Sequence, residues 1–160
     1  MINQYERVMA EKDRKNVIKE TDCANQHAEL YFSNPKVSTL QCYENRFPGS
    51  DNLINIKTYE FTSLSPTGDA YYGTVEISYV PDKLCLEPKS LRLYLNTYRV
   101  FGSSRETAIN TMLAHLVEAC LPQQMAVKGV FSLDGTQTEI YAYHNWSRER
   151  VKKRHEEVLK

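Results

Sequence analysis

The sequence predicts an α+β fold, in which an antiparallel four-stranded sheet carries two helices on one face in the order ββααββ. Each of two strand pairs is joined by a turn that contains glycine, and two stretches with helical apolar spacing lie between the pairs. The length of 160 residues suits one domain. We therefore expect a single domain over residues 1–160, with its core at about residues 50–146.

The N-terminal part of the chain is expected to precede this core. Residues 2–20 mix apolar side chains with many charges, which predicts a weakly amphipathic helix. Residues 23–52 follow no period, and Pro35, Pro48 and Gly49 mark turns. We therefore expect residues 1–49 to form a helix and an irregular extension.

The first strand pair comprises residues 54–61 and 73–80. Residues 66–69, Pro-Thr-Gly-Asp, have the composition of a turn, and the second strand alternates apolar with polar side chains. This pattern predicts an antiparallel hairpin.

Two helices follow. Pro88 favours the first turn of a helix, and a second apolar stripe stops before Pro122. The residues at helical spacing are Leu91, Tyr94, Leu95 and Tyr98 in the first helix, and Ile109, Met112, Leu113, Leu116, Val117 and Cys120 in the second.

The second strand pair comprises residues 125–131 and 138–143, joined at Asp134-Gly135, a strong hairpin signal. Residues 147–160 predict a highly charged C-terminal helix. A four-stranded sheet of this kind has two open edges, so we expect it to pair edge to edge with sister subunits.

Composition argues against several function classes. The 20 basic and 20 acidic residues give a net charge of zero, so composition shows no excess of positive charge for binding nucleic acid or a membrane surface. No apolar segment of the sequence is long enough to span a bilayer. The N-terminus lacks a signal-peptide pattern. We expect a cytoplasmic protein with reduced thiols and no metal site, because the cysteines do not have metal-ligand spacing: Cys23, Cys42, Cys85 and Cys120.

Two segments of the sequence resemble the 7-cyano-7-deazaguanine reductase family, whose members are nitrile reductases with the tunnelling fold. They are residues 60–68, Glu-Phe-Thr-Ser-Leu-Ser-Pro-Thr-Gly, and residues 87–95, Glu-Pro-Lys-Ser-Leu-Arg-Leu-Tyr-Leu. The resemblance covers about residues 40–146. It implies a tunnelling fold, a purine-like small-molecule substrate, and a ring-shaped homo-oligomer with active sites at subunit interfaces.

The chain departs from this family at the positions that carry the chemistry. By the resemblance, Ser65 occupies the position of the family's nucleophilic cysteine. Tyr71 occupies the position of the catalytic aspartate, if this chain has a one-residue deletion. Arg105 replaces the histidine that precedes the purine-binding glutamate. Three such differences favour natural divergence over one engineered substitution. A serine hydroxyl needs an adjacent base, which Arg105 cannot be, so we do not expect covalent catalysis by Ser65. Ser65 is interpreted as a pocket-lining hydroxyl or as a turn serine that bonds to the backbone, and Tyr71 as a proton donor or a packing aromatic. In the catalytic interpretation Arg105 orients a substrate carboxylate, and Tyr71, together with Ser65, supplies or relays the proton.

Glu106 has two interpretations. It lies three residues after Ser103, which is the spacing of a capping box at a helix start. By the family resemblance it is the glutamate that binds the N–H groups of a guanine-like edge, for which a carboxylate with two parallel hydrogen bonds is well suited.

The resemblance also includes a nicotinamide-cofactor motif, of which Glu87, Lys89, Ser90 and Arg92 are the cofactor-binding candidates. Lys and Arg on one helix suit a phosphate. The same residues also suit the solvated face of an amphipathic helix. A protein without the family's nucleophile and acid has no use for a hydride donor in nitrile reduction. NADPH is therefore expected only under the reductase alternative.

The leading hypothesis is therefore a reaction without redox chemistry or a required cofactor, the decarboxylation of 7-carboxy-7-deazaguanine to 7-deazaguanine. Divergent relatives of this kind occur in bacteriophage gene sets that modify DNA, in which case the protein would work on the free base in the host cytoplasm. The alternatives are an NADPH-dependent nitrile reductase in which Cys42 or Asp69 replaces the missing groups, a non-catalytic 7-deazaguanine-binding protein, and an amidine-forming transferase.

Overall fold

The computed structural model describes residues 34–133 and 135–146. The helices predicted at residues 2–20 and 147–160 lie outside the described residues. Within the described part of the chain, no helix is both long and apolar enough to cross a membrane.

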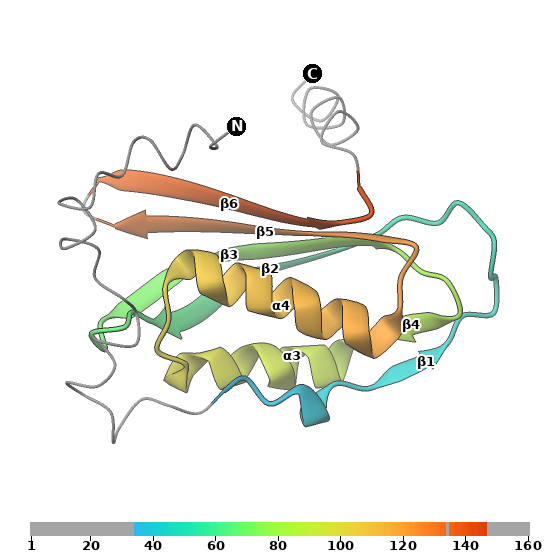
Figure 1. Cartoon of the computed structure of the whole chain (residues 1–160), viewed down its shortest axis with the longest axis horizontal. Coiled ribbons are helices and arrows are strands. Elements are labelled where there is room, and N and C mark those ends of the chain that lie inside the picture. The colour runs from blue at the N-terminus through green and yellow to red at the C-terminus, as the bar shows by residue number, and fades with distance from the viewer. Residues whose placement is uncertain (1–33, 134, 147–160) are drawn as a thin grey trace, which may run out of the picture.

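A four-stranded antiparallel sheet forms the centre of the fold, with the strand order β2-β3-β5-β6 (Figure 1). The predicted ββααββ order is therefore confirmed. Each strand is longer than predicted, because polar residues near the turns continue the ladder: Tyr71, for example, pairs with Ser63. The strands are β2 (Ile54–Leu64), β3 (Ala70–Val80), β5 (Gln124–Leu133) and β6 (Thr136–His144).

The turn between β5 and β6 agrees with the predicted Asp-Gly hairpin. Leu133 pairs with Thr136, which leaves a two-residue loop, and Gly135 has a φ of 77°. Glycine adopts this left-handed conformation without steric cost.

A β-bulge in β2 was not predicted. The register with β3 shifts between Thr58 and Phe61, so that Tyr59 and Glu60 are both exposed. An extra residue exchanges the two faces of a strand. Phe61, which an unbroken alternation from Thr58 would turn outward, is instead buried in the core.

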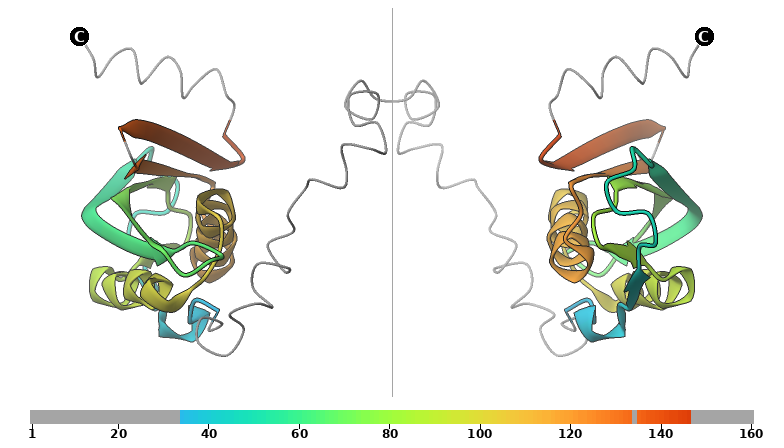
Figure 2. Two further views of the ribbon diagram at one scale, coloured as in Figure 1. Left: turned by 90° about the vertical axis from the view of Figure 1, so that its left-hand side faces the viewer. Right: turned by 90° about the vertical axis from the view of Figure 1, so that its right-hand side faces the viewer.

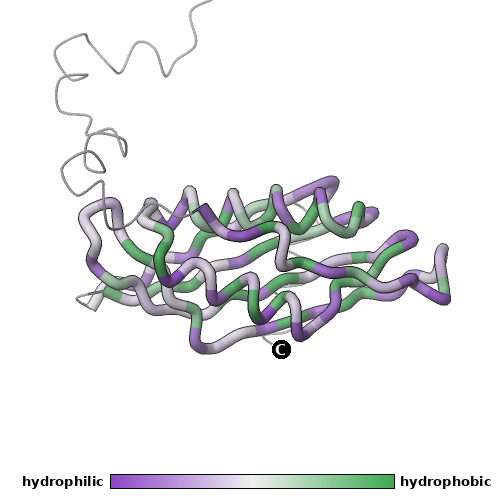
Figure 3. Tube along the Cα trace, turned by 90° about the horizontal axis from the view of Figure 1, so that it is seen from below, coloured by the Kyte–Doolittle hydropathy of each residue, from purple (hydrophilic) through white to green (hydrophobic). Residues whose placement is uncertain are grey.

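Two helices lie on one face of the sheet, as predicted (Figure 2). Helix α3 (Pro88–Asn96) continues into the 3-10 helix η3 (Thr97–Val100), and α4 spans Arg105–Cys120. Tyr98, which was predicted as part of the first helix, lies in η3. Helix α4 packs on β5 and β6, whereas α3 and η3 pack on β2. The core between the layers includes Val75, Ile77, Leu91, Ile109, Met112, Leu116 and Val127. Figure 3 shows apolar and polar residues alternating along the chain trace.

A small second sheet lies at one end of the molecule. Strand β1 (Cys42–Glu44) pairs antiparallel with β4 (Leu84–Leu86), and the 3-10 helix η2 (Val37–Thr39) precedes it. The prediction that residues 23–52 are irregular is therefore wrong at β1. A three-residue strand shows no period, and the partner of β1 lies about forty residues further along the chain.

A chain of polar side chains crosses the layer between the helices. The Tyr94 hydroxyl lies 2.8 Å from the Tyr98 hydroxyl and 2.9 Å from His115 Nδ1. Both tyrosines are fully buried, so these bonds satisfy hydroxyls that would otherwise lack partners. Burial lowers the pKa of His115 below its usual value.

Candidate functional site

The turn between β2 and β3 positions Ser65, which is only 6% exposed. Its Oγ accepts hydrogen bonds from the backbone N–H groups of Thr67 (3.2 Å) and Asp69 (2.9 Å). It also lies 2.8 Å from Thr67 Oγ1. The interpretation of Ser65 as a turn serine bonded to the backbone is therefore confirmed. Gly68, with a φ of 95°, allows the tight return of the chain.

Tyr71 lies beside this turn. It pairs with Ser63 across the ladder, and side chains two residues apart on a strand share a face, so Tyr71 and Ser65 lie on the same side of the sheet. Its ring meets Phe131 edge to face, with centroids 6.4 Å apart. Tyr72, by contrast, is 67% exposed. Of the two tyrosines, Tyr71 is thus the one packed against the core.

The start of α4 is tied to the end of β2. The Leu64 N–H donates to the Phe101 carbonyl at 3.3 Å, and the Ser103 N–H donates to the Leu64 carbonyl at 3.0 Å. Figure 1 shows the β2–β3 turn and the first turn of α4 at the same end of the molecule. This brings Arg105 over Tyr71, with the guanidinium carbon 5.0 Å from the ring centroid, within the range of a cation–π contact.

The capping-box interpretation of Glu106 is wrong. The N-cap of α4 is Ser104, whose Oγ accepts from the Thr107 N–H at 3.1 Å, whereas the Ser103 hydroxyl donates to the Ser104 carbonyl. The cap lies one residue later than predicted, because the Ser103 backbone N–H is hydrogen-bonded to the Leu64 carbonyl at the end of β2. Glu106 is exposed in the first helical turn, where the N-terminal helix dipole favours an anion.

The candidate residues form one electrostatic cluster. Burial raises the pKa of the Tyr71 phenol above its usual value. Arg105 and the nearby Ser65 hydroxyl lower that pKa, and the carboxylates of Glu106 and Asp69 raise it. Ser65, Arg105 and Glu106, which the sequence analysis assigns to one site with Tyr71, therefore all affect the pKa of its phenol.

The predicted cofactor motif divides into two parts. The Glu87 carboxylate caps α3 by accepting from the N–H groups of Lys89 (2.9 Å) and Ser90 (2.6 Å), and these bonds lower its pKa. Ser90 is buried and joins the cap to Gln41. Of the four candidates, Lys89 and Arg92 are thus the exposed ones.

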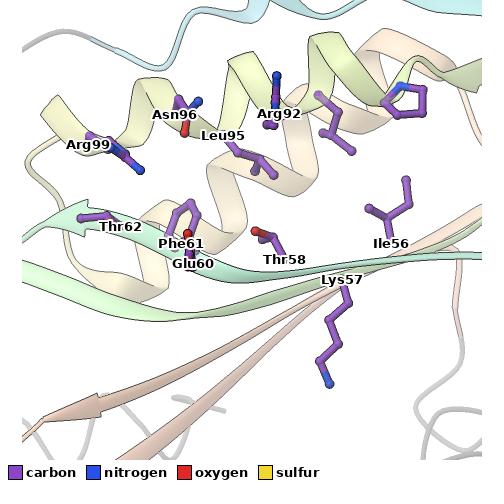
Figure 4. Close-up of a pocket in the computed structure, with 12 residues that line it drawn as sticks. Ile56, Lys57, Thr58, Glu60, Phe61, Thr62, Arg92, Leu95, Asn96 and Arg99 are labelled. Carbon is purple, nitrogen blue, oxygen red and sulfur yellow. The ribbon is translucent and has the colours of Figure 1, made fainter.

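Arg92 lines an open groove of about 240 Å³ between β2 and the α3–η3 segment (Figure 4). Arg99 and Asn96 lie along the same helical wall, and Thr58 and Thr62 come from β2. Two guanidinium groups beside hydroxyl and amide groups suit the phosphates of a nicotinamide cofactor. The groove is also lined by the Glu60 carboxylate, which would repel a phosphate, and its lining contains no thiol for nitrile chemistry.

The described cysteines lie far from this cluster. The Cys42 Sγ donates to the Ala119 carbonyl at 3.4 Å, near the C-terminus of α4. The sixteen residues of α4 separate its two ends by about 22 Å. Burial raises the pKa of Cys42, and it raises that of Cys120 to about 12. Within one chain, Cys42 therefore cannot replace the missing nucleophile, and residues 34–133 and 135–146 contain no cluster of metal-binding side chains.

Sequence reasoning missed two contributors to the site. Thr67 bonds Ser65 and Asp69, and its place in a Ser-Pro-Thr-Gly-Asp turn was the available signal. Phe131 supports Tyr71 from β5, and no local pattern could have paired the two.

Comparison with a solved structure defines the class of protein. The crystal structure of the archaeosine synthase QueF-Like in the apo form matches with a TM-score of 0.58 at 20% identity, over 61% of this chain and 98% of that chain. At this identity the match speaks for the fold alone, and the α+β architecture is the tunnelling fold.

Sequence comparison gives the family. The NADPH-dependent 7-cyano-7-deazaguanine reductase of Chlorobaculum parvum is 46% identical over 101 residues, which are 62% of this chain and 87% of the relative. The Streptococcus thermophilus enzyme of the same name is 41% identical over 124 residues, or 77% and 74% of the two chains. The family model described as QueF-like protein matches residues 71–150. The chain belongs to the QueF-like family, whose relatives act in the 7-deazaguanine pathway.

Proposed function

We propose that this protein decarboxylates 7-carboxy-7-deazaguanine to 7-deazaguanine, acting on the free base without a thioimide intermediate or a required cofactor. The observation that supports this most directly is Arg105 over the Tyr71 ring, at 5.0 Å from its centroid. A cation and a phenol meet at the site where the family resemblance places a thiol and a carboxylate.

Glu106 would hold the base. Its carboxylate is exposed at the start of α4, so it is accessible to the ring N–H and exocyclic amine of a guanine-like edge. Two parallel N–H···O bonds to a carboxylate give both strength and orientation. Arg105, the preceding residue, would hold the substituent at position 7.

Charge distinguishes the acid from the nitrile. An aspartate about 4 Å from a substrate carboxylate would repel it by about 4 kcal/mol at an effective dielectric of ~20. Tyr71 removes that repulsion, and a charge-assisted contact with Arg105 would add about 1.5–3 kcal/mol. Asp69 remains in the vicinity, but its carboxylate is exposed and accepts a hydrogen bond from Thr67.

Tyr71 would supply the proton. Protonation of the ring carbon at position 7 lets the bond to the carboxylate break, with its electron pair returning to the ring and carbon dioxide leaving. The tyrosinate formed in this step would be stabilised by Arg105, which lowers the pKa of the phenol. The net reaction consumes one proton from solvent.

The proposal includes a setting for the protein. 7-Deazaguanine would be built into DNA, as in bacteriophage gene sets that modify their DNA, and the enzyme would act in the cytoplasm of the host. A ring-shaped homo-oligomer with sites at subunit interfaces is supported by the edge strands β2 and β6, which end the sheet on either side.

An NADPH-dependent nitrile reductase is the second candidate. The relatives carry that name, and Arg92 and Arg99 line a groove suited to phosphates. Asp69 lies close enough to Tyr71 to affect its pKa and would then be the acid. No described thiol lies near these groups, which favours the decarboxylase.

Mass spectrometry of the purified protein with 7-carboxy-7-deazaguanine tests the proposal. We expect loss of carbon dioxide with or without NADPH, a much slower reaction in Tyr71→Phe, and an unchanged one in the exposed neighbour variant Tyr72→Phe. Unchanged acid under all conditions would refute the decarboxylase. NADPH oxidation by the nitrile would then support the reductase, and binding without turnover of either compound would indicate a binding protein.

A further inference from the structure

We propose that Phe131 is a positioning residue that holds the Tyr71 phenol beneath Arg105. Two glycines on neighbouring strands, Gly73 and Gly129, leave the room that the Phe131 ring needs for this role. The inference rests on the proposed function, in which the phenol and the guanidinium act on one substrate carboxylate. Phe131 is only 1% exposed, so it acts through Tyr71 and not on the substrate itself.

The two glycines, which we call the glycine seat, support the Phe131 ring from the sheet. A Cβ on Gly73 would lie 2.8 Å from Phe131 Cδ1 and 3.2 Å from its Cε1, and a Cβ on Gly129 would lie 2.7 Å from its Cε2. Non-bonded carbon atoms prefer separations of about 3.5–4.0 Å, so neither side chain would fit. One edge of the ring therefore lies over Gly73 and the opposite edge over Gly129. Glycine within a strand often marks such a close approach.

The strand register places Tyr71 next to this ring. Phe131 on β5 lies directly opposite Gly73 on β3, and Tyr71 comes two residues before Gly73, so it projects from the same face of the sheet. Tyr71 and Phe131 are thus diagonal neighbours, a spacing that aromatic side chains can bridge. Their ring centroids are 6.4 Å apart at an interplanar angle of 65°, which is a favourable edge-to-face contact. This contact sets the height of the phenol above the sheet.

Phe61 supports the Phe131 ring from a second strand. The bulge in β2 turns Phe61 into the core, where its ring meets that of Phe131 edge to face with centroids 6.2 Å apart. Phe131 is therefore bounded by the glycine seat, by Phe61 and by Tyr71. A closely packed core transmits a change of shape to its neighbours, so a smaller side chain at position 131 would let the Tyr71 ring move.

Helix α4 also rests on the glycine seat. A Cβ on Gly129 would lie 2.7 Å from Ile109 Cδ1, so the Ile109 side chain reaches the sheet at this point. Arg105 comes four residues before Ile109, one turn earlier on the same side of α4. The contact of Ile109 with Gly129 therefore sets how closely the start of α4 approaches the sheet. Both partners of the 5.0 Å contact between guanidinium and phenol are thus positioned from the same two glycines.

The proposed reaction depends on the relative position of these two groups. The Tyr71 hydroxyl must reach the ring carbon that carries the carboxylate while Arg105 holds that carboxylate. A displacement of about 1 Å can cost on the order of 100-fold in rate. The base itself would be held by Glu106, which is exposed on α4, so a movement of the phenol should affect kcat more than KM.

Phe131→Leu is the test variant, and Met125→Val is its control. Both shorten a buried side chain on the same face of β5, but Met125 lies six residues, or about 20 Å, from Phe131. We expect Phe131→Leu to lower kcat for decarboxylation by about 10- to 100-fold and to change KM by less than about threefold. Met125→Val should change both by less than about twofold. An unchanged kcat in Phe131→Leu, or equal effects of the two variants, would overturn the positioning role.

A second measurement does not need turnover. Because Arg105 lies over the Tyr71 ring, the ring current should shift its side-chain proton resonances upfield in NMR spectra of protein with isotope-labelled arginine. Arg105→Lys assigns these signals, and Tyr71→Leu gives their positions without the ring. Phe131→Leu should lose most of the shift and Met125→Val should keep it. A full shift in Phe131→Leu would refute the positioning role. If the shift is lost but wild type leaves the acid unchanged, the positioning stands and the proposed reaction alone fails.

Discussion

Replacing Arg105 with alanine should separate the carboxylate ligand from the nitrile. The guanidinium lies over Tyr71 and is half-buried, so a substrate carboxylate that reached it would be only partly screened by water. At about 4 Å and an effective dielectric of ~20, the direct attraction is about 4 kcal/mol. Desolvation and side-chain ordering reduce this to the about 1.5–3 kcal/mol typical of a hydrogen bond to a charged group.

The corresponding loss of affinity for 7-carboxy-7-deazaguanine is about 10- to 150-fold. The nitrile carries no charge, so it should lose only what depends on the order of the Tyr71 ring, about 0.5–1 kcal/mol or a few-fold. Isothermal titration calorimetry of both ligands, without NADPH, measures the difference directly.

Arg99→Ala is the matched control. Arg99 is an exposed arginine that lines the groove beside α3, so its loss should leave the binding of both free bases unchanged. Equal losses for acid and nitrile in Arg105→Ala would refute the role of Arg105 in recognising the carboxylate. An effect of Arg99→Ala equal to that of Arg105→Ala would show that overall charge, and not position, is responsible.

Three further predictions concern recognition, pH and packing. Glu106→Gln should weaken acid and nitrile alike by about 1.5–3 kcal/mol, since both share the guanine-like edge; unchanged titrations would exclude Glu106 as the base receptor. Burial lowers the pKa of His115 below its value in the unfolded chain, so the unfolded state binds more protons. The free energy of unfolding should therefore fall as the pH drops below about 6.5. Urea unfolding at neutral and mildly acidic pH should show this loss in wild type and a smaller loss in His115→Gln. A Cβ at Gly73 would collide with the Val130 carbonyl and lie 2.8 Å from Phe131 Cδ1, so Gly73→Ala should cost about 1–3 kcal/mol in a thermal melt, while the exposed Tyr72→Ala should cost much less.

Part of the site could be predicted because family resemblance carries residue identities. Ser65, Tyr71, Arg105 and Glu106 are all named from sequence, and in the structure the other three affect the pKa of the Tyr71 phenol. The prediction of a capping box at Ser103 is wrong, because residue spacing does not reveal the hydrogen bond between the Ser103 N–H and the Leu64 carbonyl. Competition between a local cap and a long-range backbone bond is visible only once both segments are placed.

The cofactor motif is a second example. From sequence, Glu87, Ser90 and Arg92 were equivalent candidates on one helix. The structure uses the first two to cap and anchor α3 and leaves Arg92 at a groove with Arg99, a residue the motif did not include. The groove wall is formed by two helical segments and a strand, so no single run of sequence could define it.

The amino-acid sequence by itself determined the order of the four long strands and the two helices, the turn chemistry and the apolar faces of the helices, because these depend on residues within a few positions of one another. Only the tertiary structure decided which side chains converge. The bulge in β2 exchanges the faces of that strand, and the bonds from Leu64 to the start of α4 bring Arg105 over Tyr71. Such contacts join segments about forty residues apart, and their geometry is set by packing across the whole sheet.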